Sequence, residues 1–224
     1  MTVANKIKPE IKVQEGLDFI LQHFSTPLFP RNIMTQRLGR QVLALNKEEA
    51  IKHFTESHFL DCRISAYPPN SGFGINMIAP SLIFVDLDTS RFTSERAYKL
   101  ALSRTLTNIK SNLNSLPTVL WSGNGNHIIQ PISALVLEEL DLFSTFDKPS
   151  VNFLRWAEQF LSNGKSDPDH TKTLSFGNCL LRIPGSHNSK CVAANAGIID
   201  EKTEVRIIQK WNGYRPHVRV LLGS

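Results

Sequence analysis

The chain has 224 residues, enough for one large domain or two small ones with a substantial core. Its 41% hydrophobic and 20% charged residues are typical of a globular protein, and its net charge of +5 is compatible with a polyanionic partner without requiring one. The odd count of three cysteines argues against a disulfide framework, and the lack of a Cys-x-x-Cys pair argues against structural zinc. No apolar run is long enough to cross a bilayer, so we expect a cytoplasmic protein without a membrane anchor.

The first 60 residues are expected to be mainly helical, after a polar leader over residues 1–10. Apolar residues at helical spacing predict helices over residues 12–23 and 48–59. Residues 31–40 between them carry three arginines, which could meet phosphates, although a solvated loop is the favoured interpretation. We expect one domain over residues 1–224, with a catalytic core from about residue 60 onward.

Residues 81–88 form an apolar run that ends in two acids, Asp86 and Asp88. The β-branched and aromatic residues at its centre predict a short buried strand. Because side chains at i and i+2 leave the same face of a strand, both carboxylates would point the same way. A divalent cation between them would offset their repulsion. Alternatively, the two acids open the following turn or cap a helix that starts near Thr93 and Ser94.

The rest of the chain predicts alternating strands and helices. A long helix with an apolar stripe ending at Leu113 separates the strand with the two acids from a strand over residues 118–121, which is βαβ order. A hairpin follows, with its second arm over residues 126–132. The other predicted elements are a strand over 61–67 with a turn at 68–72, a helix over 150–161, an irregular polar segment over 164–173, and strands over 178–183, 192–199, 204–208 and 218–222.

Two further stretches carry residues suited to binding phosphate. The first is a glycine-rich turn, Ser122-Gly123-Asn124-Gly125-Asn126-His127, in which backbone N–H groups can approach an anion. His127 could hold a phosphate oxygen or transfer a proton, although a plain tight turn is the simpler interpretation. The second combines the acids Asp167 and Asp169 with a downstream set of an arginine, a hydroxyl, an amide and an ammonium, namely Arg182, Ser186, Asn188 and Lys190.

Taken together, these stretches resemble the archaeo-eukaryotic primase superfamily, specifically the primase-polymerase catalytic domains of archaeal plasmids, viruses and mobile elements. Three motifs carry the resemblance in the family's order: hydrophobic-Asp-x-Asp ending at Asp88, Ser-Gly-x-Gly-x-His from Ser122 to His127, and an acid followed by Arg-x-Pro-Gly-Ser-x-Asn-x-Lys from Arg182 to Lys190. The resemblance implies a mixed α+β fold with an RNA-recognition-motif-like sheet flanked by helices.

The resemblance also implies the roles of the site residues. Two divalent cations, Mg²⁺ or Mn²⁺, would be held by Asp86, Asp88 and a third acid, for which Asp167 is preferred and Asp169 is the alternative. The incoming nucleoside triphosphate, an NTP or a dNTP, would be held by His127 and by a set of polar residues. These are Ser122, Gly123, Asn124, Arg182 and Lys190, with Ser186 and Asn188 as weaker candidates.

The implied activity is template-directed nucleotidyl transfer that makes and extends short RNA or DNA primers on single-stranded DNA. A helicase or accessory region could act with such a domain. Two other functions use parts of the same pattern. A metal-dependent nuclease would use the carboxylates but needs no triphosphate clamp, and a non-catalytic RNA-recognition-like module would display aromatic residues on its sheet where this chain has acids.

Overall fold

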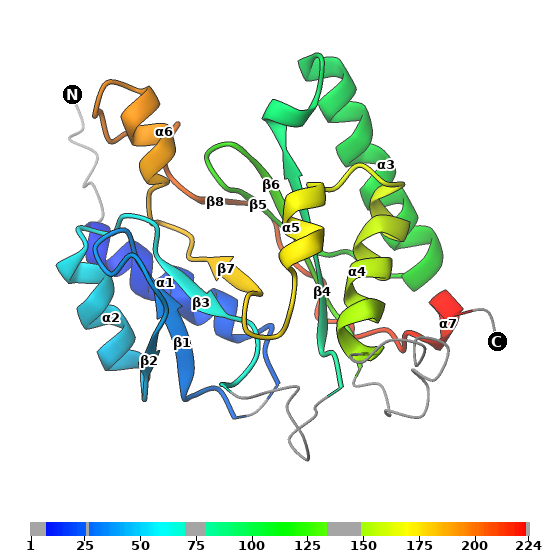
Figure 1. The fold of residues 1–224 in the computed structure, drawn as a ribbon, viewed down its shortest axis with the longest axis horizontal. Coiled ribbons are helices and arrows are strands. Elements are labelled where there is room, and N and C mark those ends of the chain that lie inside the picture. The colour runs from blue at the N-terminus through cyan, green and yellow to red at the C-terminus, as the bar shows by residue number, and fades with distance from the viewer. Residues whose placement is uncertain (1–7, 26, 70–78, 134–148, 223–224) are drawn as a thin grey trace, which may run out of the picture.

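The computed structural model describes residues 8–25, 27–69, 79–133 and 149–222, so most of the polar leader and residues 70–72 of the predicted turn lie outside it. The chain forms two four-stranded antiparallel sheets flanked by helices (Figure 1). This confirms the expected mixed α+β class. Buried residues of both sheets and of the helices form one hydrophobic core.

The first sheet has the strand order β2-β1-β3-β7 and is flanked by α1 (Pro9–Leu21) and α2 (Lys47–Glu56) (Figure 1). Its strands are β1 (Arg31–Met34), β2 (Val42–Ala44), β3 (Arg63–Ser65) and β7 (Leu180–Arg182). Two of these strands fall within the first 60 residues, so that part of the chain is not only helical. The two predicted helices are present with shifted ends.

Arg31 corrects the interpretation of residues 31–40 as a loop that might meet phosphates. It begins β1 and is only 1% exposed. Its guanidinium donates to the carbonyl oxygens of Leu28 at 2.8 Å and Pro27 at 3.1 Å, and lies over the ring of Phe24. These contacts satisfy the buried cation internally, so Arg31 has a structural role.

The second sheet has the order β4-β6-β5-β8. Its strands are β4 (Leu82–Asp88), β5 (Thr118–Trp121), β6 (Gly125–Pro131) and β8 (Arg206–Gln209). Both β4 and β5 pair antiparallel with β6, which lies between them, so β4 and β5 run parallel without touching. The predicted βαβ unit is therefore split by the second arm of the hairpin.

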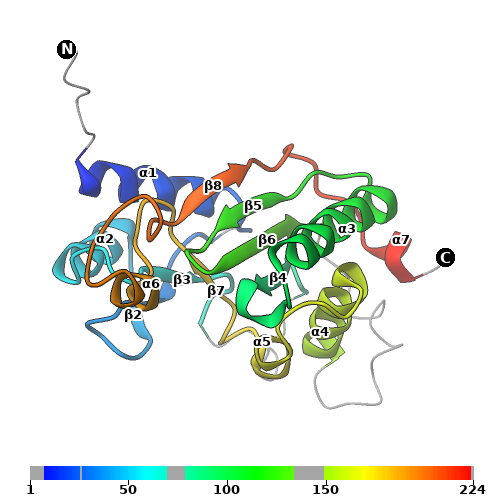
Figure 2. The ribbon, with the colours of Figure 1, turned by 90° about the horizontal axis from the view of Figure 1, so that it is seen from above.

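Two long helices, α3 (Glu95–Leu113) and α4 (Pro149–Ser162), pack against each other, and α4 packs against β4 (Figure 2). Ser94 begins α3, since its side chain accepts a hydrogen bond from the backbone N–H of Ala97. In the described ranges, no helix is long and apolar enough to cross a membrane.

The last third of the chain differs most from the predictions. The polar segment 164–173 contains a short helix, α5 (Pro168–Thr173), capped by Asp167. The predicted strands over 192–199 and 218–222 are wrong, because the chain forms α6 (Ser189–Ala194) and α7 (Arg219–Leu222) there. The Asn188 side chain caps α6 by accepting from the N–H of Lys190 at 3.1 Å, and this local hydrogen bond outweighs the β-branched composition that favoured a strand.

The chain crosses between the two sheets three times. Strands β1 to β3 belong to the first sheet and β4 to β6 to the second; β7 then returns to the first sheet and β8 to the second. As a result, β7 pairs with β3 although more than a hundred residues separate them. This return brings the segment after Arg182 next to the turn between β5 and β6.

Candidate active site

A cavity of about 320 Å³ lies between the two sheets. Strands of both sheets contribute to its walls, and nine of the residues singled out from the sequence line it. Those nine are Asp86, Asp88, Ser122, Asn124, His127, Asp167, Arg182, Asn188 and Lys190. The other lining residues are Arg63, Phe84, His170, Thr173, Asn178 and Leu180.

Asp86 and Asp88 end β4 and share the face that lines the cavity, while Leu87 between them is fully buried. Asp88 also accepts hydrogen bonds from the backbone N–H of Ser90 at 2.8 Å and from Nδ2 of Asn124 at 2.9 Å. It therefore caps the short 3₁₀ helix η2 (Thr89–Arg91), as the alternative interpretation expected of these acids, and lines the cavity as well.

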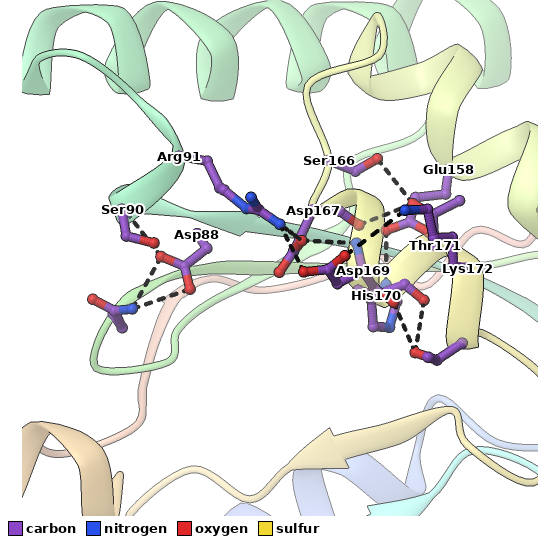
Figure 3. A network of polar contacts seen from close by, with 12 residues as sticks. Asp88, Ser90, Arg91, Glu158, Ser166, Asp167, Asp169, His170, Thr171 and Lys172 are labelled. Carbon is purple, nitrogen blue, oxygen red and sulfur yellow. Dashed lines mark hydrogen bonds and ion pairs between the residues drawn. The ribbon is translucent and has the colours of Figure 1, made fainter.

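Asp167 and Asp169 lie side by side against Arg91 (Figure 3), but they differ in their relation to the cavity. Asp167 lines it, and its backbone N–H donates to the carbonyl oxygen of Asp86 at 2.9 Å. The Asp169 side chain is 76% exposed and is not among the lining residues. Nη2 of Arg91 lies 2.8 Å from Oδ1 of Asp167 and 3.0 Å from Oδ2 of Asp169, so one arginine holds both acids.

Negative charge accumulates at this end of the cavity. Burial raises the pKa of Asp86, the charge of His170 opposes this effect, and the carboxylates of Glu158, Asp88 and Asp167 add to it, so that the pKa reaches about 6. Burial alone would also raise the pKa of Asp167, but the hydrogen bond from Arg91 lowers it below its ordinary value. The carboxylates of Asp86, Asp88 and Asp167 thus form an acidic end of the cavity.

The acidic end fits an open divalent cation site. Across the described ranges, no three His, Cys, Asp or Glu side chains gather closely enough to enclose a metal ion by themselves. Mg²⁺ is usually held by one or two carboxylates together with water and substrate phosphates, so such a cage is not required. Asp86 and Asp88 supply carboxylates on one face, and the pKa of Asp86 is raised by burial and by the neighbouring carboxylates, both of which disfavour a charge that a bound cation would offset.

His127 lies on β6 directly opposite Asp86 on β4. Its Nε2 is 3.7 Å from Oδ1 of Asp86, and its ring meets Phe84 edge-on with ring centroids 5.0 Å apart. Burial, together with the positive charges of Arg182, His170 and Arg63, lowers the pKa of His127 well below its ordinary value. The imidazole is therefore neutral, and its buried Nδ1 has no hydrogen-bond partner among the described residues.

The glycine-rich turn packs closely against the segment after Arg182 and is hydrogen-bonded to it. Gly123 has a φ of +95°, and a β-carbon there would lie 2.8 Å from Cβ of Asn188, so only glycine fits this contact. Nδ2 of Asn188 donates to the carbonyl oxygen of Ser122 at 2.9 Å. Two motifs more than sixty residues apart in the sequence thus form one wall of the cavity, and Asn188 positions that wall.

Arg182 and Lys190 add positive charge to the same cavity. Arg182 is buried, and its Nη1 donates to Oδ1 of Asp61 at 2.7 Å. Ser186, by contrast, does not line the cavity, which corrects its assignment as a phosphate contact. It is fully buried and its hydroxyl donates to the carbonyl oxygen of Ile183 at 2.6 Å, so it fixes the turn after β7.

A buried pair behind the cavity wall has no role in the three motifs: His170 lines the cavity, and Glu158 contacts His170 from outside the lining. Glu158 on α4 is 0% exposed, and its Oε1 lies 2.8 Å from Nδ1 of His170 (Figure 3). Burial alone would lower the pKa of His170, but the hydrogen bond with Glu158 and the nearby carboxylates raise it. One signal for Glu158 was available in the sequence, because it lies at an inward position of the predicted helix over 150–161, three residues before Leu161.

Carboxylate, guanidinium and ammonium groups line the same cavity, with Asp86 and Asp88 on a strand of the second sheet and Arg182 on a strand of the first. Such a cavity can hold a phosphorylated ligand between a bound cation and fixed positive charges. Its walls come from both sheets, so the fold itself brings the acidic and basic groups together.

The fold is similar to that of a primase catalytic domain of known structure. No family model matches the sequence, and no curated protein matches it. Among solved structures, the chain is similar to the catalytic domain of the primase RepB′, crystallised in complex with initiator DNA, with a TM-score of 0.53. The similarity covers 94% of this chain and 92% of that chain at 11% sequence identity, and at that identity it concerns the fold alone.

Proposed function

We propose that this chain is a template-directed nucleotidyltransferase that makes short primers on single-stranded DNA from nucleoside triphosphates and extends them. The observation that carries the proposal is the set of charges that line one cavity, namely the carboxylates of Asp86, Asp88 and Asp167 together with the cations of Arg182 and Lys190. The similarity in fold to a primase catalytic domain supports it.

In the proposed reaction, a hydroxyl oxygen of the initiating nucleotide or growing strand forms a bond to the α-phosphorus of the incoming nucleotide. The bond from that phosphorus to the bridging oxygen of the β-phosphate breaks, its electron pair leaves with pyrophosphate, and the hydroxyl proton passes to solvent. The side chains contribute mainly by positioning, because Arg182, Lys190 and neutral His127 would hold the phosphates in line with the attacking oxygen.

Divalent cations at Asp86, Asp88 and Asp167 would lower the pKa of the attacking hydroxyl and stabilise the leaving pyrophosphate. In this scheme the Arg91 guanidinium keeps Asp167 ionised and oriented toward the cavity. Nδ2 of Asn124 orients the Asp88 carboxylate by donating to its two oxygens at 2.9 and 3.0 Å.

The direct test is incubation with a single-stranded DNA template, Mg²⁺ or Mn²⁺ and labelled nucleotides in the absence of a primer. Primer-length products are expected from the native chain and none from a variant with Asp86→Ala and Asp88→Ala. Cleavage of labelled single-stranded DNA without nucleotide incorporation would favour the nuclease alternative. Template binding without either reaction would favour the non-catalytic module.

Substitutions of Asp167 and Asp169, the two candidates for the third carboxylate, are predicted to have very different effects on primer synthesis. Asp167→Asn is expected to reduce primer synthesis by about two orders of magnitude or more, because it removes a carboxylate that faces the cavity. Asp169→Asn is its matched control, since Asp169 shares the Arg91 ion pair but is mostly exposed. Initial rates of nucleotide incorporation measure both, and equal losses in the two variants would contradict this choice of ligand.

A further inference from the structure

Strand β8 borders a groove that is separate from the active-site cavity. It is an edge strand, because it comes last in the order β4-β6-β5-β8 and pairs with β5 on one side. A groove of about 380 Å³ lies between β8 and α1, and it shares no lining residue with the cavity (Figure 2). The unpaired edge of a strand presents backbone N–H and C=O groups that can accept another strand.

The lining residues show that one wall of the groove is a helix face and the other a strand edge. Lys12, Glu15, Gly16 and Phe19 of α1 line it at the spacing i, i+3, i+4 and i+7, which places them on one face of the helix. The consecutive residues 205–207 line the other wall. Successive side chains leave opposite faces of a strand, so three residues in a row border one groove when the edge of the strand faces it. The backbone of β8 is therefore opposite a helix face.

The groove offers an apolar contact and is closed at one end. Phe19 and Ile207 line it and are partly buried against the core, so an apolar side chain of a ligand would rest on them. Near Gly185, which packs against the backbone of Lys12, Nζ of Lys12 donates to Oε1 of Glu204 at 3.1 Å. This ion pair joins the two walls, and the groove extends from it along β8.

The strand wall carries two cations without a partner in the fold. Arg206 and Lys210 line the groove, are exposed, and form no ion pair with any described residue. Lys12 and Glu204 offset each other, and Glu15 lies on the opposite wall. Negative charge on a ligand is therefore favoured beside β8.

The same two cations disfavour a second copy of this chain as the occupant. If two β8 strands paired antiparallel about a twofold axis, Arg206 of one copy would come near Lys210 of the other, and like charges opposite each other destabilise a sheet. The wall formed by α1 would also obstruct the rest of a second sheet. A single extended chain with acidic residues meets neither obstacle.

We propose that the groove between α1 and β8 binds an extended acidic segment of a partner protein, which adds to the second sheet as a strand beside β8. Main-chain hydrogen bonds to β8 supply affinity in this mode of recognition, and side-chain contacts supply specificity. Here the specificity comes from carboxylates beside Arg206 and Lys210 and from an apolar side chain on Phe19 and Ile207. The interaction does not depend on the proposed function.

The first test uses a fluorescein-labelled eight-residue peptide of alternating valine and threonine with an aspartate at each end, and measures its binding to the full chain by fluorescence anisotropy. Saturable binding is expected. A version with lysine in place of each aspartate should bind about fivefold more weakly or worse, because two attractive charge contacts become repulsive. Equal binding of the two peptides, or no saturable binding of the aspartate peptide, would overturn the proposal.

Two further versions of the aspartate peptide separate strand addition from a purely electrostatic contact. Each is N-methylated on alternate amides, so that one edge of the extended peptide or the other cannot donate hydrogen bonds. The version whose blocked edge faces β8 is expected to lose about tenfold in affinity, and the other should bind like the parent peptide. Parent-like binding by both versions would contradict strand addition.

Charge reversal in the chain tests the two cations. Arg206→Glu combined with Lys210→Glu is expected to reverse the preference between the aspartate and lysine peptides. Arg40→Glu combined with Lys52→Glu is the matched control, because it makes the same change in charge at an exposed arginine and an exposed lysine outside the groove. If both double variants keep the native preference, Arg206 and Lys210 do not bind the acidic residues and the proposal fails.

A last measurement needs only the native chain. Amide hydrogen exchange over residues 205–210 is expected to slow when the aspartate peptide is added, while exchange in β2, the edge strand of the first sheet, stays unchanged. Slowing by oligodeoxythymidylate and not by the peptide would assign the groove to nucleic acid. A dimer in sedimentation equilibrium that is lost in Arg206→Glu with Lys210→Glu would assign it to a second copy. Either outcome would refute the peptide as occupant.

Discussion

Replacing Asp86 with asparagine is expected to abolish primer synthesis and, in the absence of metal, to raise the free energy of unfolding near neutral pH. Burial raises the pKa of Asp86 from 3.8 to about 6 in the folded chain. The folded state therefore holds this proton more tightly than the unfolded state, and stability falls as the pH rises from about 4 to about 6. The shift corresponds to about 3 kcal/mol above that range, and asparagine avoids this loss.

Denaturant unfolding between pH 4 and pH 8, with chelator present, measures the effect. The native chain is expected to lose stability across that window and the variant Asp86→Asn to lose less. Mg²⁺ should restore stability to the native chain at pH 7.5 and have little effect on the variant, since the charge that the cation offsets is gone. Asp169→Asn, with its exposed side chain, should behave like the native chain. If Asp86→Asn were less stable than the native chain at pH 7.5, the ionised Asp86 carboxylate would not be destabilising in the folded state, contrary to this prediction.

The second large effect is a loss of stability, expected when the buried pair of Glu158 and His170 is broken. His170→Ala leaves the carboxylate of Glu158 fully buried, and among the described residues the remaining donor is the backbone N–H of Asp86 at 3.3 Å. Removing one partner of a buried ion pair typically costs about 3–5 kcal/mol, so this variant should lose a large part of its stability. Lys172→Ala, on an exposed side chain of the same helix, is the control.

Replacing both partners distinguishes the loss of the ion pair from a general loss of packing. A variant with Glu158→Leu and His170→Phe removes both charges together and is expected to be more stable than His170→Ala. Because the folded state raises the pKa of His170, the stability that this pair provides is present at low pH and declines as the pH rises through that raised value. If the free energy of unfolding falls by the same amount in the single and the double variant, Glu158 and His170 do not stabilise the fold as an ion pair.

Much of the second sheet and its helices could be predicted from the sequence. The apolar run before Asp86, the long stripe ending at Leu113 and the glycine-rich hairpin are strong local signals, and the structure has β4, α3 and the β5–β6 hairpin there. The first sheet was harder, because β1 and β2 are only four and three residues long. Strands this short carry too little periodicity to separate them from a loop.

The residues of the candidate site also divide into those that the sequence predicts and those that it does not. Motif spacing identified nine residues that the structure places around one cavity, whereas Arg63, Glu158 and His170 lacked any motif role. They approach the cavity through pairing between strands and packing between helices, which depend on contacts distant in the sequence. Ser186 shows the opposite error, since its motif position suggested a ligand contact while its hydroxyl is used within a turn.

The return of the chain to the first sheet has a consequence for how the protein folds. Strand β7 joins β3 only after the whole of β4, β5 and β6 has been made, and β8 completes the second sheet later still. Such long-range pairing closes large loops and is slow compared with local helix and hairpin formation. During synthesis on the ribosome, the carboxylates of the cavity can therefore be in place before Arg182 and Lys190. The lining of the cavity is complete only once the chain as far as Lys190 has emerged, so a chain that ends before β7 should not acquire the site.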